Sequence, residues 1–174
     1  MRVFVALELK DEDVRRRIAV AQEKLAAPGL RSVDPAAFHM TLKFIGEVPD
    51  ASVQRIAGAL RGVRQPSFDA RFSGMGAFPS PSRPSVVWVG VREGSEGMVA
   101  LQAAVGEALR DWGREERGFK PHLTIFRVAQ GARVPELDGW QDFGTARFAE
   151  FQLKRSLLTS AGPVYSDIER YGLG

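Results

Sequence analysis

The sequence predicts an α+β protein in which the sheets are antiparallel or mixed. Alternating apolar residues indicate about eight strands, and apolar residues at helical spacing indicate three or four helices. Several strands follow one another without an intervening helix, which is typical of antiparallel pairing rather than of βαβ repetition. A short motif also recurs about half a chain apart, which indicates two related lobes.

The first half of the chain is predicted to hold four strands and two helices. Asp11 begins the first helix, which Pro28-Gly29 ends; Pro49-Asp50 begins the second, which Pro66 ends. The expected strands are residues 2–9, 30–33, 38–45 and 68–74.

The second half begins with a loop, because three prolines between residues 78 and 84 prevent regular strand pairing. The segment 135–143 is ambiguous between a loop and a short helix. The other expected elements are strands at 85–91, 122–128, 145–158 and 164–171, and a helix at 97–112.

The chain has 174 residues, enough for one ordinary domain or for two small lobes that share a core. It contains no Cys, which excludes disulfides, a Cys nucleophile and thiolate metal sites. No apolar run is long enough to span a bilayer, and the first ten residues are typical of a strand rather than of a secretory signal. A cytoplasmic protein is therefore expected.

The charge balance permits a phosphate-bearing partner without demonstrating one. Lys and Arg number 24 against 21 Asp and Glu, which gives a net charge of +3 and a pI near 9.6. Arg supplies 19 of these cations, and its planar guanidinium fits a phosphate better than a point charge does. A compositional bias would produce the same excess.

The chain's only two histidines lie in one local pattern, His-x-Thr followed by an apolar residue. The two copies are His39-Met40-Thr41-Leu42 and His122-Leu123-Thr124-Ile125. Because residues i and i+2 of a strand point to the same face, each His is expected to project together with its Thr. If a pseudo-two-fold axis relates the two lobes, both pairs meet in one cleft.

Two imidazoles and two hydroxyls suit phosphodiester chemistry. A neutral His accepts a proton from water, while a protonated His supplies one to the leaving oxygen, and a pKa near 6.5 makes both forms accessible at neutral pH. The Thr hydroxyls can donate to phosphate oxygens that gain charge in the transition state. Such a scheme requires no metal.

Both motifs resemble those of the 2H phosphoesterase superfamily. The chain is most similar to the bacterial and archaeal RNA 2′,3′-cyclic phosphodiesterases, also called 2′-5′ RNA ligases. Each motif is weak by itself, whereas their order and spacing together are specific. The similarity extends over nearly the whole chain and is carried by residues 2–9, 39–48, 78–91, 119–128 and 155–165.

The resemblance implies a bilobal, pseudo-two-fold fold with an antiparallel sheet in each lobe, helices outside and the active site in the cleft between the lobes. Residues 1–174 would form one catalytic domain of two intertwined lobes. The implied activity is hydrolysis of RNA 2′,3′-cyclic phosphate ends to 2′-phosphates with no required cofactor. The reverse reaction at the same site would be 2′-5′ ligation. The expected partner is RNA or an oligonucleotide with such an end. A monomer is expected, with no membrane and no obligate protein partner.

Catalytic and phosphate-binding roles follow residue by residue from the resemblance. His39 and His122 would form the acid–base pair, and Thr41 and Thr124 would bind the phosphate. Arg127 is also expected to bind phosphate, although strict alternation places it on the face opposite His122. It therefore requires a bulge, a twist or a long reach.

Other side chains are candidates for the phosphate or for a base. Lys43 lies on the same face as His39 by period two and is expected to bind phosphate. Trp88, in an apolar strand, is expected in the core. Three aromatic residues are candidate base or cleft contacts: Phe78, Phe119 and Tyr165.

A non-catalytic RNA- or nucleotide-binding module with the same fold is the main alternative, but phosphate binding alone would not require two His-x-Thr pairs. A zinc site is disfavoured because neither His has Asp, Glu or Cys at ligand spacing. Within the enzyme hypothesis, we expect His122 to activate the water and His39 to protonate O3′. The swapped assignment is equally compatible with the sequence.

Overall fold

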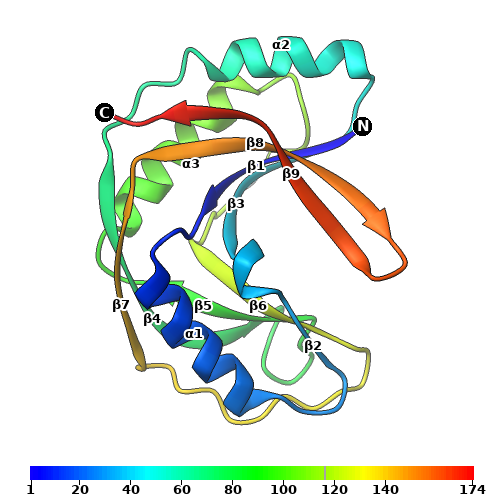
Figure 1. Cartoon of the computed structure of the whole chain (residues 1–174), viewed down its shortest axis with the longest axis vertical. Helices are drawn as coiled ribbons and strands as arrows, with labels where there is room; N and C mark the ends of the chain where they lie inside the picture. The colour runs from blue at the N-terminus through cyan, green and yellow to red at the C-terminus, as the bar shows by residue number, and fades with distance from the viewer. Residues whose placement is uncertain (116) are drawn as a thin grey trace.

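The strands form two antiparallel sheets that face each other (Figure 1). The computed structural model describes residues 1–115 and 117–174, which contain nine strands, three α-helices and one 3₁₀ turn. Sheet A has the order β3-β1-β8-β9, and sheet B has the order β2-β6-β5-β4-β7. This arrangement confirms the predicted α+β class with an antiparallel sheet in each half.

The first sheet joins strands from both ends of the chain. It consists of β1 (Arg2–Glu8), β3 (His39–Glu47), β8 (Glu150–Thr159) and β9 (Gly162–Gly172). The outer parts of β8 and β9 extend beyond the rest of the sheet as a hairpin (Figure 1).

The second sheet comes mainly from the middle of the chain. It consists of β2 (Leu30–Ser32), β4 (Phe68–Phe78), β5 (Val86–Val91), β6 (His122–Val128) and β7 (Asp142–Phe148). The first His-x-Thr motif thus begins a strand of sheet A, and the second begins a strand of sheet B. Each sheet supplies one half of the expected site.

The helices lie on the outer side of the sheets. In α1 (Glu12–Leu25), the Asp11 carboxylate accepts the Val14 amide as an N-cap, and Val14 and Ile18 are buried. This helix packs near β7, while α3 (Ser95–Ala108) packs on β3 and β4, and α2 (Asp50–Leu60) lies against α3 (Figure 1). A 3₁₀ turn over Pro35–Ala37 leads into β3. None of the helices in the described part of the chain has the length and apolar character needed to cross a bilayer.

One hydrophobic core connects both sheets. The residues between the His and Thr of each motif, Met40 and Leu123, are both fully buried in it. Their burial fixes the orientation of the strands, because a strand that buries residue i+1 turns residues i and i+2 to the opposite face. The core therefore directs each His-x-Thr pair away from itself.

The C-terminal third differs from the prediction. The expected strand over 145–158 is two strands in different sheets, β7 and β8, with Ala149 between them. A continuous alternation of apolar residues does not reveal that the chain crosses from one sheet to the other. The ambiguous segment up to Gln141 is irregular, and the Asp138 carboxylate holds it by accepting the amides of Trp140 and Gln141.

Candidate active site

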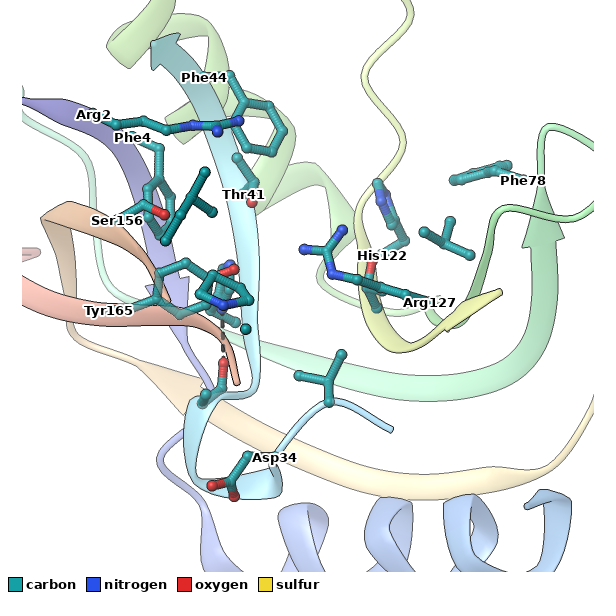
Figure 2. A pocket seen from close by; sticks show the side chains of 18 of the residues that line it. Arg2, Phe4, Asp34, Thr41, Phe44, Phe78, His122, Arg127, Ser156 and Tyr165 are labelled. Carbon is teal, nitrogen blue, oxygen red and sulfur yellow. Dashed lines mark hydrogen bonds between the residues drawn. The ribbon is translucent and has the colours of Figure 1, made fainter. Parts of the chain in front are cut away.

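A cleft of about 1270 Å³ lies between the two sheets and contains both His-x-Thr pairs (Figure 2). His39 and Thr41 reach it from β3, while His122 and Thr124 reach it from β6. Thr41 and Thr124 both line the cleft, and neither hydroxyl has a hydrogen-bond partner in the described part of the chain. Both hydroxyls are therefore available to a ligand.

The two imidazoles are held in the same way. In each ring, Nδ1 lies 2.7 Å from the carbonyl oxygen two residues earlier, Ala37 for His39 and Lys120 for His122. A carbonyl only accepts, so Nδ1–H donates and Nε2 remains as the proton-transfer atom. An aromatic ring also packs edge-on against each imidazole: Tyr165 on His39 at 5.2 Å between centroids, and Phe78 on His122 at 5.0 Å.

The surroundings of His39 favour its neutral form. Burial lowers the pKa of His39, and the positive charges of Lys154 and Arg127 act in the same direction. The hydrogen bond to the Ala37 carbonyl and the negative charge of Glu8 oppose this shift. Burial has the largest effect, so the free protein holds His39 neutral at neutral pH.

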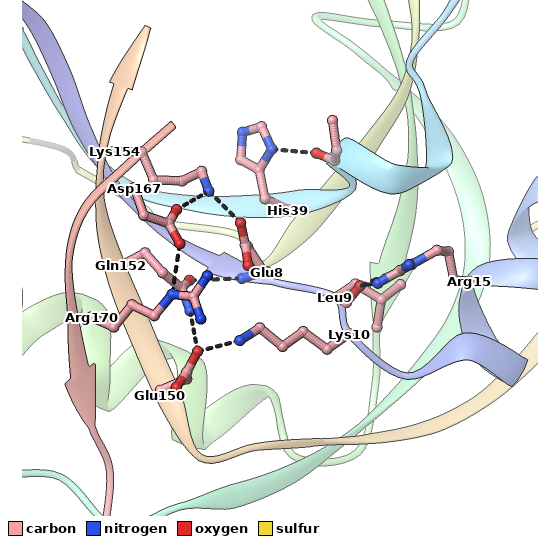
Figure 3. A network of polar contacts seen from close by, with 11 residues as sticks. Glu8, Leu9, Lys10, Arg15, His39, Glu150, Gln152, Lys154, Asp167 and Arg170 are labelled. Atoms are coloured by element: carbon pink, nitrogen blue, oxygen red, sulfur yellow. Dashed lines mark hydrogen bonds and ion pairs between the residues drawn. The ribbon is translucent and has the colours of Figure 1, made fainter. Parts of the chain in front are cut away.

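A buried ion-pair network lies beside His39 (Figure 3). The ammonium of Lys154, whose side chain is 5% exposed, donates to the carboxylates of Glu8 and Asp167. Glu8 is also the residue directly opposite His39 in the pairing of β1 with β3. Within this network, the charges of Lys154 and Glu8 act on the pKa of this imidazole in opposite directions.

A β-bulge in β6 brings Arg127 to the cleft. Thr124 pairs with Trp88 and Phe126 pairs with Val87, so Ile125 is an extra residue without an opposite partner in β5. The carbonyl of Ile125 instead accepts from the Val33 amide and from the buried Gln22 side chain. This bulge reverses the alternation, and Figure 2 shows the Arg127 side chain in the cleft beside His122.

The same irregularity in β3 corrects the prediction for Lys43. Thr41 pairs with Ala6 and Lys43 with Val5, so Leu42 is the extra residue. Lys43 is therefore turned away from the cleft and is buried, and its ammonium donates to the Arg114 carbonyl at 3.2 Å. The expectation that Lys43 shares the face of His39 is wrong, because strict period two fails at a bulge.

Phe44 takes the cleft position that Lys43 was expected to occupy. It lines the cleft and is 60% exposed, which is unusual for a Phe side chain. Phe44 follows His39 by five residues, as Arg127 follows His122. Both sheets thus present His, Thr and a third side chain, an aromatic ring on sheet A and a cation on sheet B.

The three predicted aromatic candidates, Phe78, Phe119 and Tyr165, all line the cleft. Trp88 does not lie in the core as expected. It is half-buried on the cleft face of sheet B, opposite Thr124, and packs against Phe78 at 5.0 Å between ring centroids. Gly76 makes room for it, since a Cβ there would lie 2.3 Å from the indole ring. The sequence did not point to Gly76, because the side chain that requires a glycine there, Trp88, comes from another strand.

The cleft carries more positive than negative charge. Its described lining includes five Lys and Arg side chains but only one carboxylate, that of Asp34. The cations are Arg2, Arg31, Arg117, Lys120 and Arg127. Such a lining favours an anionic ligand. Of these five residues, the sequence motifs pointed only to Arg127.

Two antiparallel sheets that each bring a His-x-Thr strand to one cleft define a 2H phosphoesterase. Comparison with known proteins agrees with this class. The family described as LigT like Phosphoesterase matches residues 7–88, which contain the first motif. A solved structure of E. coli LigT complexed with 3′-AMP has a TM-score of 0.82 and 26% identity, covering 99% of this chain and 97% of that one.

Curated relatives extend the match to the full length. An RNA 2′,3′-cyclic phosphodiesterase of Archaeoglobus fulgidus is 37% identical over 97% of this chain and 98% of its own. A protein of the same name from Methanothermobacter thermautotrophicus is 37% identical over 99% of each chain. The chain therefore belongs to the LigT-like phosphoesterase family of the 2H superfamily.

Proposed function

We propose that this protein hydrolyses RNA 2′,3′-cyclic phosphate ends to 2′-phosphates. The observation that carries the proposal is the placement of two His-x-Thr pairs in one positively charged cleft. The names of the full-length relatives support the same activity. Both motifs come from one chain, so one copy completes the proposed site, and we propose a monomer that acts in the cytoplasm.

The phosphate lies between the two sheets in this proposal. The hydroxyls of Thr41 and Thr124 and the guanidinium of Arg127 donate to its non-bridging oxygens, whose charge grows in the transition state. Phe44, exposed in the same cleft, offers a face on which the terminal base can stack. A simple binding module would have no need of two imidazoles with a free Nε2 each.

The environment of His39 favours it as the base, the reverse of our initial expectation. A general base must be neutral before the reaction, and burial keeps the His39 imidazole neutral at neutral pH. Nε2 of His39 takes a proton from water as its oxygen attacks phosphorus. His122 gives the proton on its Nε2 to O3′ as the P–O3′ bond breaks. The products are a 2′-phosphate and a free 3′-hydroxyl.

A mononucleotide assay tests the function itself. Cytidine 2′,3′-cyclic phosphate is incubated with the protein in EDTA, and the product is identified by ³¹P NMR. We expect turnover to the 2′-phosphate at a rate that EDTA does not change. No turnover, or formation of the 3′-phosphate only, would contradict the proposal. In the presence of a 5′-hydroxyl RNA, the same step with that hydroxyl in place of water would give a 2′-5′ link.

The buried network beside His39 predicts pH shifts of opposite sign. In Lys154→Met, a positive charge that disfavours the imidazolium is lost, so the pKa of His39 rises and the acidic limb of kcat/KM moves to higher pH. In Glu8→Gln, a negative charge that favours the imidazolium is lost, so the pKa of His39 falls and the acidic limb of kcat/KM moves to lower pH. Lys10→Met, which removes a lysine from the more exposed pair with Glu150, is the matched control and should leave the profile in place. Shifts of equal sign in the first two variants would refute this account.

A further inference from the structure

A second groove of about 440 Å³ adjoins the cleft on sheet B. It shares four lining residues with the cleft: Phe78, Phe119, Lys120 and His122. Its floor includes Trp88, whose indole Nε1 is buried and has no hydrogen-bond partner in the described part of the chain. A ligand that fills the cleft can therefore continue past His122 into an aromatic groove.

Arg92 provides the groove with a positive charge at a fixed position. Its guanidinium lies 4.2 Å from the centroid of the Trp140 ring and donates to the Gly139 carbonyl at 3.2 Å. Trp140 itself is 77% exposed, on a loop that packs closely against Gly74 of β4. The cation–π contact with Trp140 holds the guanidinium of Arg92 beside the groove.

No carboxylate is found among the described residues that line the groove, whereas Arg92 and Lys120 both contribute positive charge. Two nearby carboxylates, Glu93 and Asp142, pair with Arg71 instead, at 3.7 and 2.5 Å. The charge of Arg92 is thus left for an external anion.

We infer that this groove binds the 5′ phosphate and the preceding nucleotide of the substrate RNA strand. The inference rests on the proposed function. If His122 protonates O3′, the terminal ribose lies on the sheet B side of the phosphate. The strand that continues from O5′ then runs toward the groove, where Arg92 and Lys120 meet its phosphate and the aromatic lining meets the preceding base.

Three substrates with the same reacting end test the groove: A>p, pA>p and ApA>p, where >p is the 2′,3′-cyclic phosphate. We expect wild type to prefer pA>p and ApA>p over A>p by about tenfold in kcat/KM, as one charge-assisted phosphate contact would give. Arg92→Ala should lose this preference and keep its rate on A>p. Trp140→Ala should weaken the preference, because Arg92 loses its cation–π contact with the indole. Arg16→Ala, which removes an exposed arginine on α1, is the control for charge.

Equal kcat/KM for the three substrates in wild type, or an unchanged preference in Arg92→Ala, would overturn the inference. A defect limited to 2′-5′ ligation of a second RNA would also overturn it, because the groove would then hold the attacking strand. Failure of wild type to hydrolyse any of the three substrates would instead refute the proposed function, so the two outcomes are distinguishable.

Discussion

His39→Ala and His122→Ala are each expected to lower kcat on a 2′,3′-cyclic phosphate by about 10²–10⁴-fold, the range for loss of one acid–base group. The double variant should be little worse than either single variant, because the two imidazoles act in one concerted step. Both side chains are partly exposed to the cleft, so their removal should leave the fold intact.

Steady-state kinetics checks this prediction, with thermal unfolding as the control for folding. Binding of a nucleoside 2′-phosphate should persist in both variants, since Thr41, Thr124 and Arg127 remain. A single variant that keeps the wild-type rate would exclude that histidine from the chemistry.

A substrate with sulfur in place of O3′ should separate the two roles. A thiolate leaves without a proton, because thiols have a pKa near 8.5. On this substrate, His122→Ala is expected to recover to within about tenfold of wild type, whereas His39→Ala should remain slower by about 10²–10⁴-fold. Comparing the two variants on the sulfur and oxygen substrates checks the prediction. Recovery of His39→Ala alone would reverse the assignment and agree with the initial expectation from the sequence.

Much of the fold could be predicted because the signals are local. Asp11 places the start of α1, Pro49 precedes the start of α2, and alternation places most strands, whereas α2 ends at Leu60, well before Pro66, and α3 ends at Ala108 instead of residue 112. The prediction fails where the structure of a segment depends on contacts with distant parts of the chain. Whether residues 145–158 form one strand or two depends on which sheet accepts each part, and the order of the strands in a sheet is not written in any single segment.

The same distinction holds for the cleft. His39, Thr41, His122 and Thr124 could be found because each motif spans three residues of a regular strand. Directly after each motif, both β3 and β6 have a bulge, and from there on the side chains point to the opposite face from the one that strict alternation predicts. In β6, the carbonyl of the bulged Ile125 accepts from Gln22, more than a hundred residues away in sequence. Period-two reasoning therefore fails after the motif, for Lys43 and Phe44 in particular.

The repeat indicates which residue of β3 corresponds to Arg127 of β6. Aligning the two copies places Phe44 at the position of Arg127, and the expected need for a bulge at Arg127 applies equally to the first copy. Both strands show the irregularity at the same step, at Leu42 and at Ile125. The third position diverges, aromatic on sheet A and cationic on sheet B, so the two sides of a nearly symmetric cleft differ chemically.

NMR titration tests most directly whether both imidazoles face one phosphate. The chain has only two histidines, so the two Cε1–H signals can be assigned with the single variants. In the free protein, we expect His39 to titrate below the ordinary value of about 6.5, as its burial requires. Saturation with a nucleoside 2′-phosphate should raise the titration midpoints of both histidines together. If the midpoint of either histidine stays unchanged, the two do not share a phosphate, and the two-histidine mechanism is wrong.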